Sequence, residues 1–126
     1  MYKDIQDFHR RYDLSYEGQP RQLPKELAAF RIKFLKEELR EYEKAVAEKD
    51  LEGQFDALID LVYVAIGTSY LQGFPWAAGW YEVHKANMKK VRVTTQKDSK
   101  RGSTYDVVKP SGWKKPNIKR LLGLGT

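Results

Sequence analysis

The sequence predicts an all-α protein: two long antiparallel helices, several shorter ones, and a basic, irregular C-terminal tail. Three observations predict this class. Residues 25–49 contain no Gly or Pro and repeat apolar side chains at helical spacing. Residues 51–72 show a second helical pattern of the same kind. After Val91 the periodicity stops and Lys and Arg accumulate.

The first long helix is expected to follow a short helix over residues 2–13 and a loop over 14–23 that contains Gly18 and Pro20. Pro24 suits the first turn of a helix, where its missing N–H leaves no hydrogen bond unmade. The helix is expected to continue to about Lys49. Its apolar face is expected to consist of Leu27, Phe34, Leu35, Leu39, Tyr42 and Val46.

Asp50 is a suitable N-cap for the second long helix. That helix is apolar nearly all round, so we expect it to be central and buried. Gly73 is expected just after its end, and Pro75 is expected to open a third helix that runs to about Lys90. In the tail we expect a loop over 94–104, a short strand over 106–109 and a last helical turn over 118–122.

Length and composition restrict the possible function classes. The chain has 126 residues, which suits one domain over 1–126, with a helical core over about 24–91 and the basic tail over about 92–126. It has no cysteine, which excludes disulfides, zinc–thiolate sites and cysteine nucleophiles. No signal peptide is visible, and the longest apolar run, residues 61–67, is too short to span a bilayer. We therefore expect a cytoplasmic protein with no membrane partner.

The net charge of +6 is divided unevenly along the chain. Residues 85–126 hold 12 Lys/Arg and 2 Asp/Glu, a balance of +10, whereas residues 1–84 hold 11 and 15, a balance of −4. Such a division suits a nucleic-acid-binding protein. It equally suits an enzyme whose acidic half holds a metal and whose basic half holds phosphates, so the charge leaves both open.

One stripe of the first long helix carries carboxylates where an amphipathic helix would keep apolar side chains. The stripe follows alternating three- and four-residue steps through Leu27, Arg31, Phe34, Glu38, Glu41 and Ala45. Glu37 flanks it. Three carboxylates this close repel one another, and a divalent cation would relieve that repulsion. The alternative is a solvated face, because Lys residues alternate with these acids.

The second long helix adds Asp56 and Asp60, four residues apart on one face. Almost every neighbour of Asp60 is apolar, so we expect its side chain to be buried, and a buried unpaired carboxylate costs several kcal/mol. It requires a partner. A structural ion pair with Arg31 or Lys36 is one candidate; a metal shared with the first helix is the interpretation we favour.

These two acidic segments resemble a known superfamily. Residues 37–41 (EELRE), a spacer and residues 56–64 (DALIDLVYV) are similar to the all-α nucleoside triphosphate pyrophosphatases, and most similar to their MazG-like, phosphoribosyl-ATP pyrophosphohydrolase-like branch. The family pattern is Glu-x-x-Glu followed by Glu-x-x-Asp. Glu38, Glu41 and Asp60 match it. The third ligand would fall on Ala57, which cannot ligate, and Asp56 is its neighbour. Weaker similarities extend the resemblance over residues 27–118.

The resemblance implies a MazG-like helical bundle that hydrolyses an NTP or dNTP to the monophosphate and pyrophosphate with Mg²⁺, or possibly Mn²⁺. Implied metal ligands are Glu38, Glu41, Asp56 and Asp60, with Glu37 as the general base for the attacking water. Implied substrate contacts are Asn87, Lys90, Lys109 and Trp113. For Trp113 the alternative is simple packing, and for Asn87 it is a polar helix end.

Oligomerisation is expected to complete this bundle. Three or four helices of this length cannot easily bury a helix that is apolar all round, and family members form dimers or tetramers, so we expect a homodimer or homotetramer. The main competing hypothesis is a basic helical nucleic-acid-binding module without catalytic activity; a weaker one is a metal-dependent nuclease. We expect no nucleic-acid partner, because an acidic cluster without metal repels phosphate.

Overall fold

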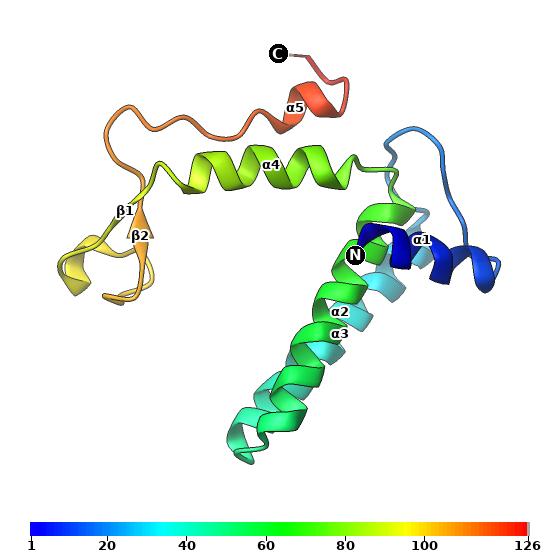
Figure 1. Ribbon diagram of the computed structural model, residues 1–126, viewed down its shortest axis with the longest axis horizontal. Helices are drawn as coiled ribbons and strands as arrows, with labels where there is room; N and C mark the ends of the chain where they lie inside the picture. The colour runs from blue at the N-terminus through cyan, green and yellow to red at the C-terminus, as the bar shows by residue number, and fades with distance from the viewer. Residues whose placement is uncertain (126) are drawn as a thin grey trace. The chain divides into compact units, whose positions relative to one another are not determined.

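The computed structural model describes residues 1–125 and is mostly helical, which confirms the predicted all-α class (Figure 1). Its elements in chain order are α1 (Tyr2–Arg11), α2 (Lys25–Ala47), α3 (Leu51–Leu71), α4 (Trp76–Asn87), β1 (Val91–Arg92), a 3₁₀ turn (Gln96–Asp98), β2 (Val107–Val108) and α5 (Ile118–Leu121). Among the described residues no single helix is long and apolar enough to cross a membrane; α3 and α4 meet that criterion only when they are counted together, by length and composition.

The chain divides into two compact units, Met1–Trp76 and Ala77–Thr126, which we call the acidic unit and the basic unit. The acidic unit holds 11 Lys/Arg and 14 Asp/Glu, a balance of −3; the basic unit holds 12 and 3, a balance of +9. The boundary precedes most of α4 and lies upstream of the composition change near residue 92. That residues 1–126 form one domain stays a prediction.

The long helices α2 and α3 lie side by side and antiparallel (Figure 1). Asp50 starts α3 as an N-cap, because its carboxylate accepts the Gly53 N–H at 2.9 Å. Buried residues recur at seven-residue spacing on each helix, which is the period of a coiled-coil seam. These are Arg31, Glu38 and Ala45 on α2, and Ala57, Val64 and Leu71 on α3.

Arg31 links the two helices along this seam. Its Nη2 donates to the carbonyl of Val64 at 2.9 Å and its Nε donates to Thr68 Oγ1 at 3.0 Å. Both acceptors lie on the same turn of α3, so a slip along the helix axis would break both bonds. Arg31 therefore holds the register in which carboxylates of α2 face α3 one to two turns further along.

Helix α1 closes the other end of α3. Ile5 packs against Ile66, Tyr70 and Leu71 in the core of the acidic unit. His9 is also buried, and its Nδ1 lies 3.0 Å from the carbonyl oxygen of Leu14, consistent with a structural role. Gly73 follows α3 with φ +69°, a left-handed conformation that suits glycine, as predicted for the residue that ends this helix.

The expectation that α3 is buried all round is wrong for the single chain. Leu58, Ile59 and Val62 are 44 to 49% exposed, because α2 and α1 cover only part of its circumference. The expected apolar face of α2 is also displaced. Leu39 and Val46 are nearly half exposed, since the buried stripe follows Arg31, Glu38 and Ala45.

In the basic unit, β1 and β2 form an antiparallel pair in which Val91 lies opposite Val108 and Arg92 opposite Val107. The predicted strand near residues 106–109 is thus present. Its partner β1 was not predicted, because the third helix was expected to continue to Lys90, whereas α4 ends at Asn87. The predicted last turn is α5, whose N-cap Asn117 accepts the Arg120 N–H.

Candidate metal centre

Three carboxylates meet on the seam of the acidic unit, and we call them the acidic trio: Glu38, Glu41 and Asp60. One oxygen of each lies within 4.8 Å of the other two. Glu38 and Glu41 are three residues apart on α2 and so share a face, and the antiparallel course of α3 brings Asp60 opposite them. Glu38 is buried, 8% exposed, whereas Glu41 is exposed.

Electrostatic strain is concentrated on Glu38. Burial raises its pKa to about 7, and a shared hydrogen bond with Glu41 and the charges of Glu41, Asp60 and Glu37 raise it further in the same direction. Its Oε2 is buried with no hydrogen-bond partner. The pKa of Asp60 is also raised, first by burial and then by the charges of Asp56 and Glu41.

No basic side chain neutralises the trio. Within residues 1–125 no ion pair of 4.0 Å or less includes Glu38, Glu41 or Asp60. Arg31 donates to Val64 and Thr68 instead, so the structural ion pair considered for Asp60 is absent. Asp60 is only partly buried, which corrects the expectation of full burial; in the single chain its face of α3 is covered by α2 alone.

Two predicted site residues lie outside the acidic trio. Asp56 is exposed and, together with Asp50 and Glu52, lines an open hollow of about 430 Å³. Glu37 is exposed on α2, and its charge reaches Glu38 as the smallest of the causes that raise that pKa. Both therefore flank the trio without joining it.

The trio fits a hard divalent cation. Carboxylate oxygens are the ligands that Mg²⁺ prefers, and one or two carboxylates with waters or substrate phosphates commonly complete its octahedron. Exposed acidic clusters are common without an ion. Here, however, a buried glutamate oxygen has no donor in the protein, and a cation at the trio would satisfy it.

The four predicted substrate contacts belong to the basic unit. Trp113 is half-buried, and its Nε1 donates to the carbonyl of Ala86 at 2.7 Å. Lys90 Nζ and Lys109 Nζ lie 5.4 and 5.1 Å from the Trp113 ring. This contact unites Lys90, Lys109 and Trp113, whereas Asn87 is exposed at the last position of α4. The indole bond to Ala86 shows that Trp113 also has the packing role considered for it.

The comparison with known families concerns the same stretch of chain. The model of the phosphoribosyl-ATP pyrophosphohydrolase family matches residues 5–87, two thirds of the sequence, and this match includes the whole acidic trio. The chain belongs to this family. No curated protein matches it significantly. The protein is therefore a hydrolase of phosphoric anhydrides, a pyrophosphohydrolase that acts on a nucleotide. The family match ends at Asn87 and does not reach Lys90, Lys109 or Trp113.

Sequence reasoning missed a polar cluster in the basic unit. Asp106 is buried and accepts hydrogen bonds from Ser99 Oγ at 2.7 Å, from the Val107 N–H at 2.8 Å and from the Arg101 guanidinium. These bonds, with Ser99 first, lower its pKa to about 2. The available signal was an Asp directly before a strand and a Ser seven residues earlier, which does not reveal a contact until the loop is folded.

Proposed function

We propose that the protein hydrolyses a nucleoside or deoxynucleoside triphosphate to the monophosphate and pyrophosphate, and that the reaction depends on Mg²⁺, with Mn²⁺ as a possible substitute. The observation that carries the proposal is the acidic trio with its unpartnered buried oxygen. Family membership supplies the reaction class. The trio adds a reason why a divalent cation would be required.

In this proposal Glu38, Glu41 and Asp60 hold the cation, and Asp56 reaches it as a further ligand from the preceding turn of α3. When bound, the cation would polarise the phosphate oxygens and acidify a water. Glu37 is exposed and adjacent, so its carboxylate is placed to accept a proton from that water. Its pKa need not be high, because a metal-bound water is already acidic.

The basic unit supplies the proposed substrate contacts. Lys90 and Lys109 pair with phosphate as point charges. The indole of Trp113 offers a stacking surface for a base, held in place by its bond to the Ala86 carbonyl. The exposed amide of Asn87 can donate and accept at once, which suits a base edge or a sugar hydroxyl.

An apolar hollow suggests that a second copy of the chain is involved. It has a volume of about 470 Å³ and is lined mainly by Ile5, Phe55, Leu58, Ile59, Val62 and Tyr63. A continuous apolar surface of this kind on one helix marks an interface. We assign it to a homodimer or a homotetramer, the states that the family resemblance implies. Sedimentation of the native protein against Val62→Glu tests this assignment; a monomeric native protein would contradict it.

The proposed activity is tested with a nucleotide panel. The protein is incubated with each canonical NTP and dNTP, with Mg²⁺, with Mn²⁺ or with chelator, and monophosphate and pyrophosphate are measured separately. We expect equal amounts of the two products from at least one nucleotide, and none in chelator. Release of orthophosphate in place of pyrophosphate would contradict the proposed bond cleavage. Equal turnover in chelator would contradict the metal requirement.

A further inference from the structure

The basic unit has an almost uncompensated cationic surface. Eleven of its twelve Lys and Arg residues are exposed; the exception is Lys90, which is half-buried. Its acids are engaged internally. Glu82 lies 3.4 Å from Lys85 Nζ, Asp98 accepts the Thr95 hydroxyl at 2.9 Å, and Asp106 is buried. A net charge of +9 therefore faces solvent with little local neutralisation.

An ordered loop lies within this surface, and we call residues 99–106 the basic loop. Its two ends are joined by the bond from Ser99 Oγ to the Asp106 carboxylate, and the Ser99 hydroxyl also accepts the Arg101 N–H at 3.1 Å. The Val93 N–H donates to the Asp106 carbonyl at 3.1 Å and ties the loop to the strand pair. A buried, fully satisfied carboxylate at its base holds the loop in one conformation.

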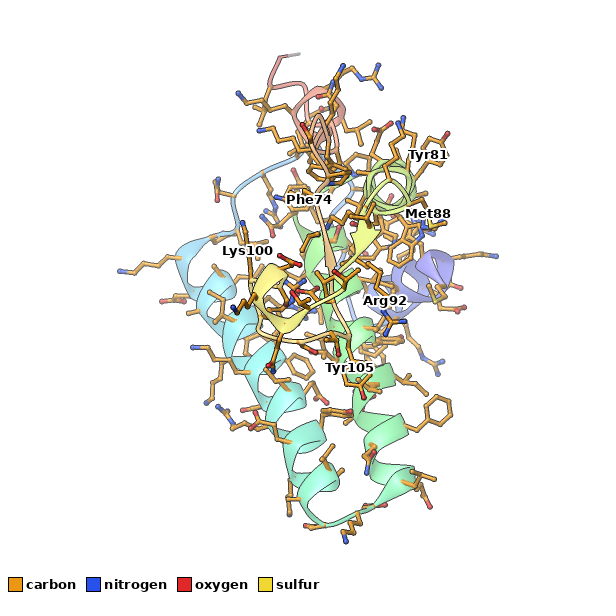
Figure 2. The ribbon with its side chains drawn as sticks, turned by 90° about the vertical axis from the view of Figure 1, so that its left-hand side faces the viewer. Phe74, Tyr81, Met88, Arg92, Lys100 and Tyr105 are labelled. Atoms are coloured by element: carbon orange, nitrogen blue, oxygen red, sulfur yellow. The ribbon has the colours of Figure 1, made fainter. Side chains whose placement is uncertain are left out.

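Tyr105 is the most exposed large side chain of the described residues, at 94%. Its own N–H donates to Ser103 Oγ at 3.0 Å, and Arg92 Nε lies 3.4 Å from the neighbouring Thr104 carbonyl. Figure 2 shows Tyr105 and Lys100 on the basic loop and Arg92 on β1. A tyrosine ring held in solvent by an anchored loop gains nothing from burial in the folded chain, but it offers a flat surface to a ligand.

We propose that the basic loop and the strand pair bind single-stranded nucleic acid, in addition to the hydrolytic activity of the chain. A base stacks on the Tyr105 ring while Arg92 and Lys100 contact neighbouring phosphates. Alternating aromatic and cationic side chains are how sequence-tolerant single-strand binders hold their ligands. In a duplex the base faces are already stacked and unavailable to Tyr105.

The number and placement of the charges favour a polymer over a free nucleotide. A triphosphate has about four negative charges and is neutralised by a few cations, whereas eleven exposed cations spread from Lys85 to Arg120 match a chain of phosphates. The carboxylates that would repel such a chain, Glu38, Glu41 and Asp60 among them, belong to the acidic unit. The objection that acids repel phosphate therefore does not apply to the basic unit by itself.

The test is fluorescence anisotropy of a labelled oligothymidylate of about 20 nucleotides with the full chain in chelator, which prevents hydrolysis. Salt is varied from about 50 to 200 mM. Tyr105→Ala should weaken binding by about fivefold or more, and Tyr105→Phe should restore it. Arg92→Ala with Lys100→Ala should lower the slope of log affinity against log salt by about two. The charge-matched control is Lys33→Ala with Lys36→Ala on α2, which should leave both affinity and slope nearly unchanged.

Four results would overturn the proposal. The first is no binding at the lowest salt; the second is an equal loss in the α2 control; the third is equal affinity for duplex of the same length. The fourth is full displacement of the oligonucleotide by a mononucleotide triphosphate at matched phosphate concentration, which would assign the basic loop to the substrate instead. Because the test uses chelator and no turnover, it is independent of the proposed hydrolysis, and circular dichroism confirms that each variant is folded.

Discussion

Glu38 in the acidic unit and Asp106 in the basic unit are buried to nearly the same degree, 8% and 9% exposed, yet their surroundings are opposite. Asp106 accepts bonds from a hydroxyl, a backbone N–H and a guanidinium. Glu38 has a buried oxygen without a donor and two carboxylates beside it. The pKa of Asp106 is accordingly lowered to about 2, while that of Glu38 is raised to about 7.

The comparison shows that burial alone does not identify a functional carboxylate. Asp106 is satisfied by the protein, and its contribution is to hold a loop. Glu38 is left unsatisfied by the protein, which lowers the stability of the metal-free fold and is reasonable only if a ligand completes the site. Each prediction below alters one side of this comparison.

The largest effect is expected from neutralising the trio. Glu41→Gln or Asp60→Asn removes a charge that would hold the cation, so turnover of the best nucleotide should fall about 100-fold or more, equivalent to several kcal/mol of transition-state stabilisation. The helical circular dichroism signal should be retained, because both side chains are at least partly exposed. Steady-state kinetics at saturating Mg²⁺ measure the change.

Glu43→Gln is the matched control for these variants, since Glu43 is an exposed carboxylate on α2 outside the trio. It should keep nearly full activity. If Asp60→Asn were as active as the native protein, Asp60 would have a structural role only, and the metal site would have to be placed elsewhere. A loss of helical signal in Asp60→Asn would likewise argue against a functional role for its charge.

A smaller effect is expected from pH. With its pKa raised from 4.5 to about 7, folded metal-free Glu38 binds a proton more tightly than the unfolded chain does. The free energy of unfolding should therefore fall as pH rises from about 4.5 to about 7, by roughly 2–3 kcal/mol in total. Urea denaturation in chelator at a series of pH values measures the slope.

Glu38→Gln should flatten this pH dependence, because glutamine does not titrate and keeps the size of the side chain. Mg²⁺ should stabilise the native protein most at the upper end of the window, where Glu38 is ionised and available as a ligand. A pH profile of Glu38→Gln that matched the native one would show that another group causes the dependence.

Much of the fold could be predicted from the sequence. Helix starts at Pro24, Asp50 and Pro75 depend on local chemistry, and the structure confirms each of them. The errors came from tertiary context. Leu39 and Val46 continue an apolar pattern, but the position of the seam depends on which stripe α3 covers, and a sequence with several apolar stripes does not specify that stripe.

The candidate site was predicted in part for the same reason. Glu38, Glu41 and Asp60 were identified because carboxylates interrupt an apolar stripe, and the structure brings them together. Asp56, one residue away from the family position, lies outside the trio. The contact between Ser99 and Asp106 depends on how an irregular loop closes, and no periodicity in the sequence reports that.

The smallest effect is expected on the satisfied side of the comparison. Because the pKa of Asp106 is lowered from 3.8 to about 2, the folded state binds fewer protons than the unfolded chain in this window. The stability that Asp106 contributes is complete above about pH 4 and is lost as pH falls toward 2. Amide NMR signals of Val93 and Val107, which report the bonds at this residue, should shift in that window while α2 signals do not. Asp106→Ala should show the loosened state already at neutral pH, and Asp98→Ala, on an exposed neighbour, should not. If Val107 remained protected in Asp106→Ala, the basic loop would be held by the strand pair alone, and Asp106 would no longer explain why Tyr105 is held in solvent.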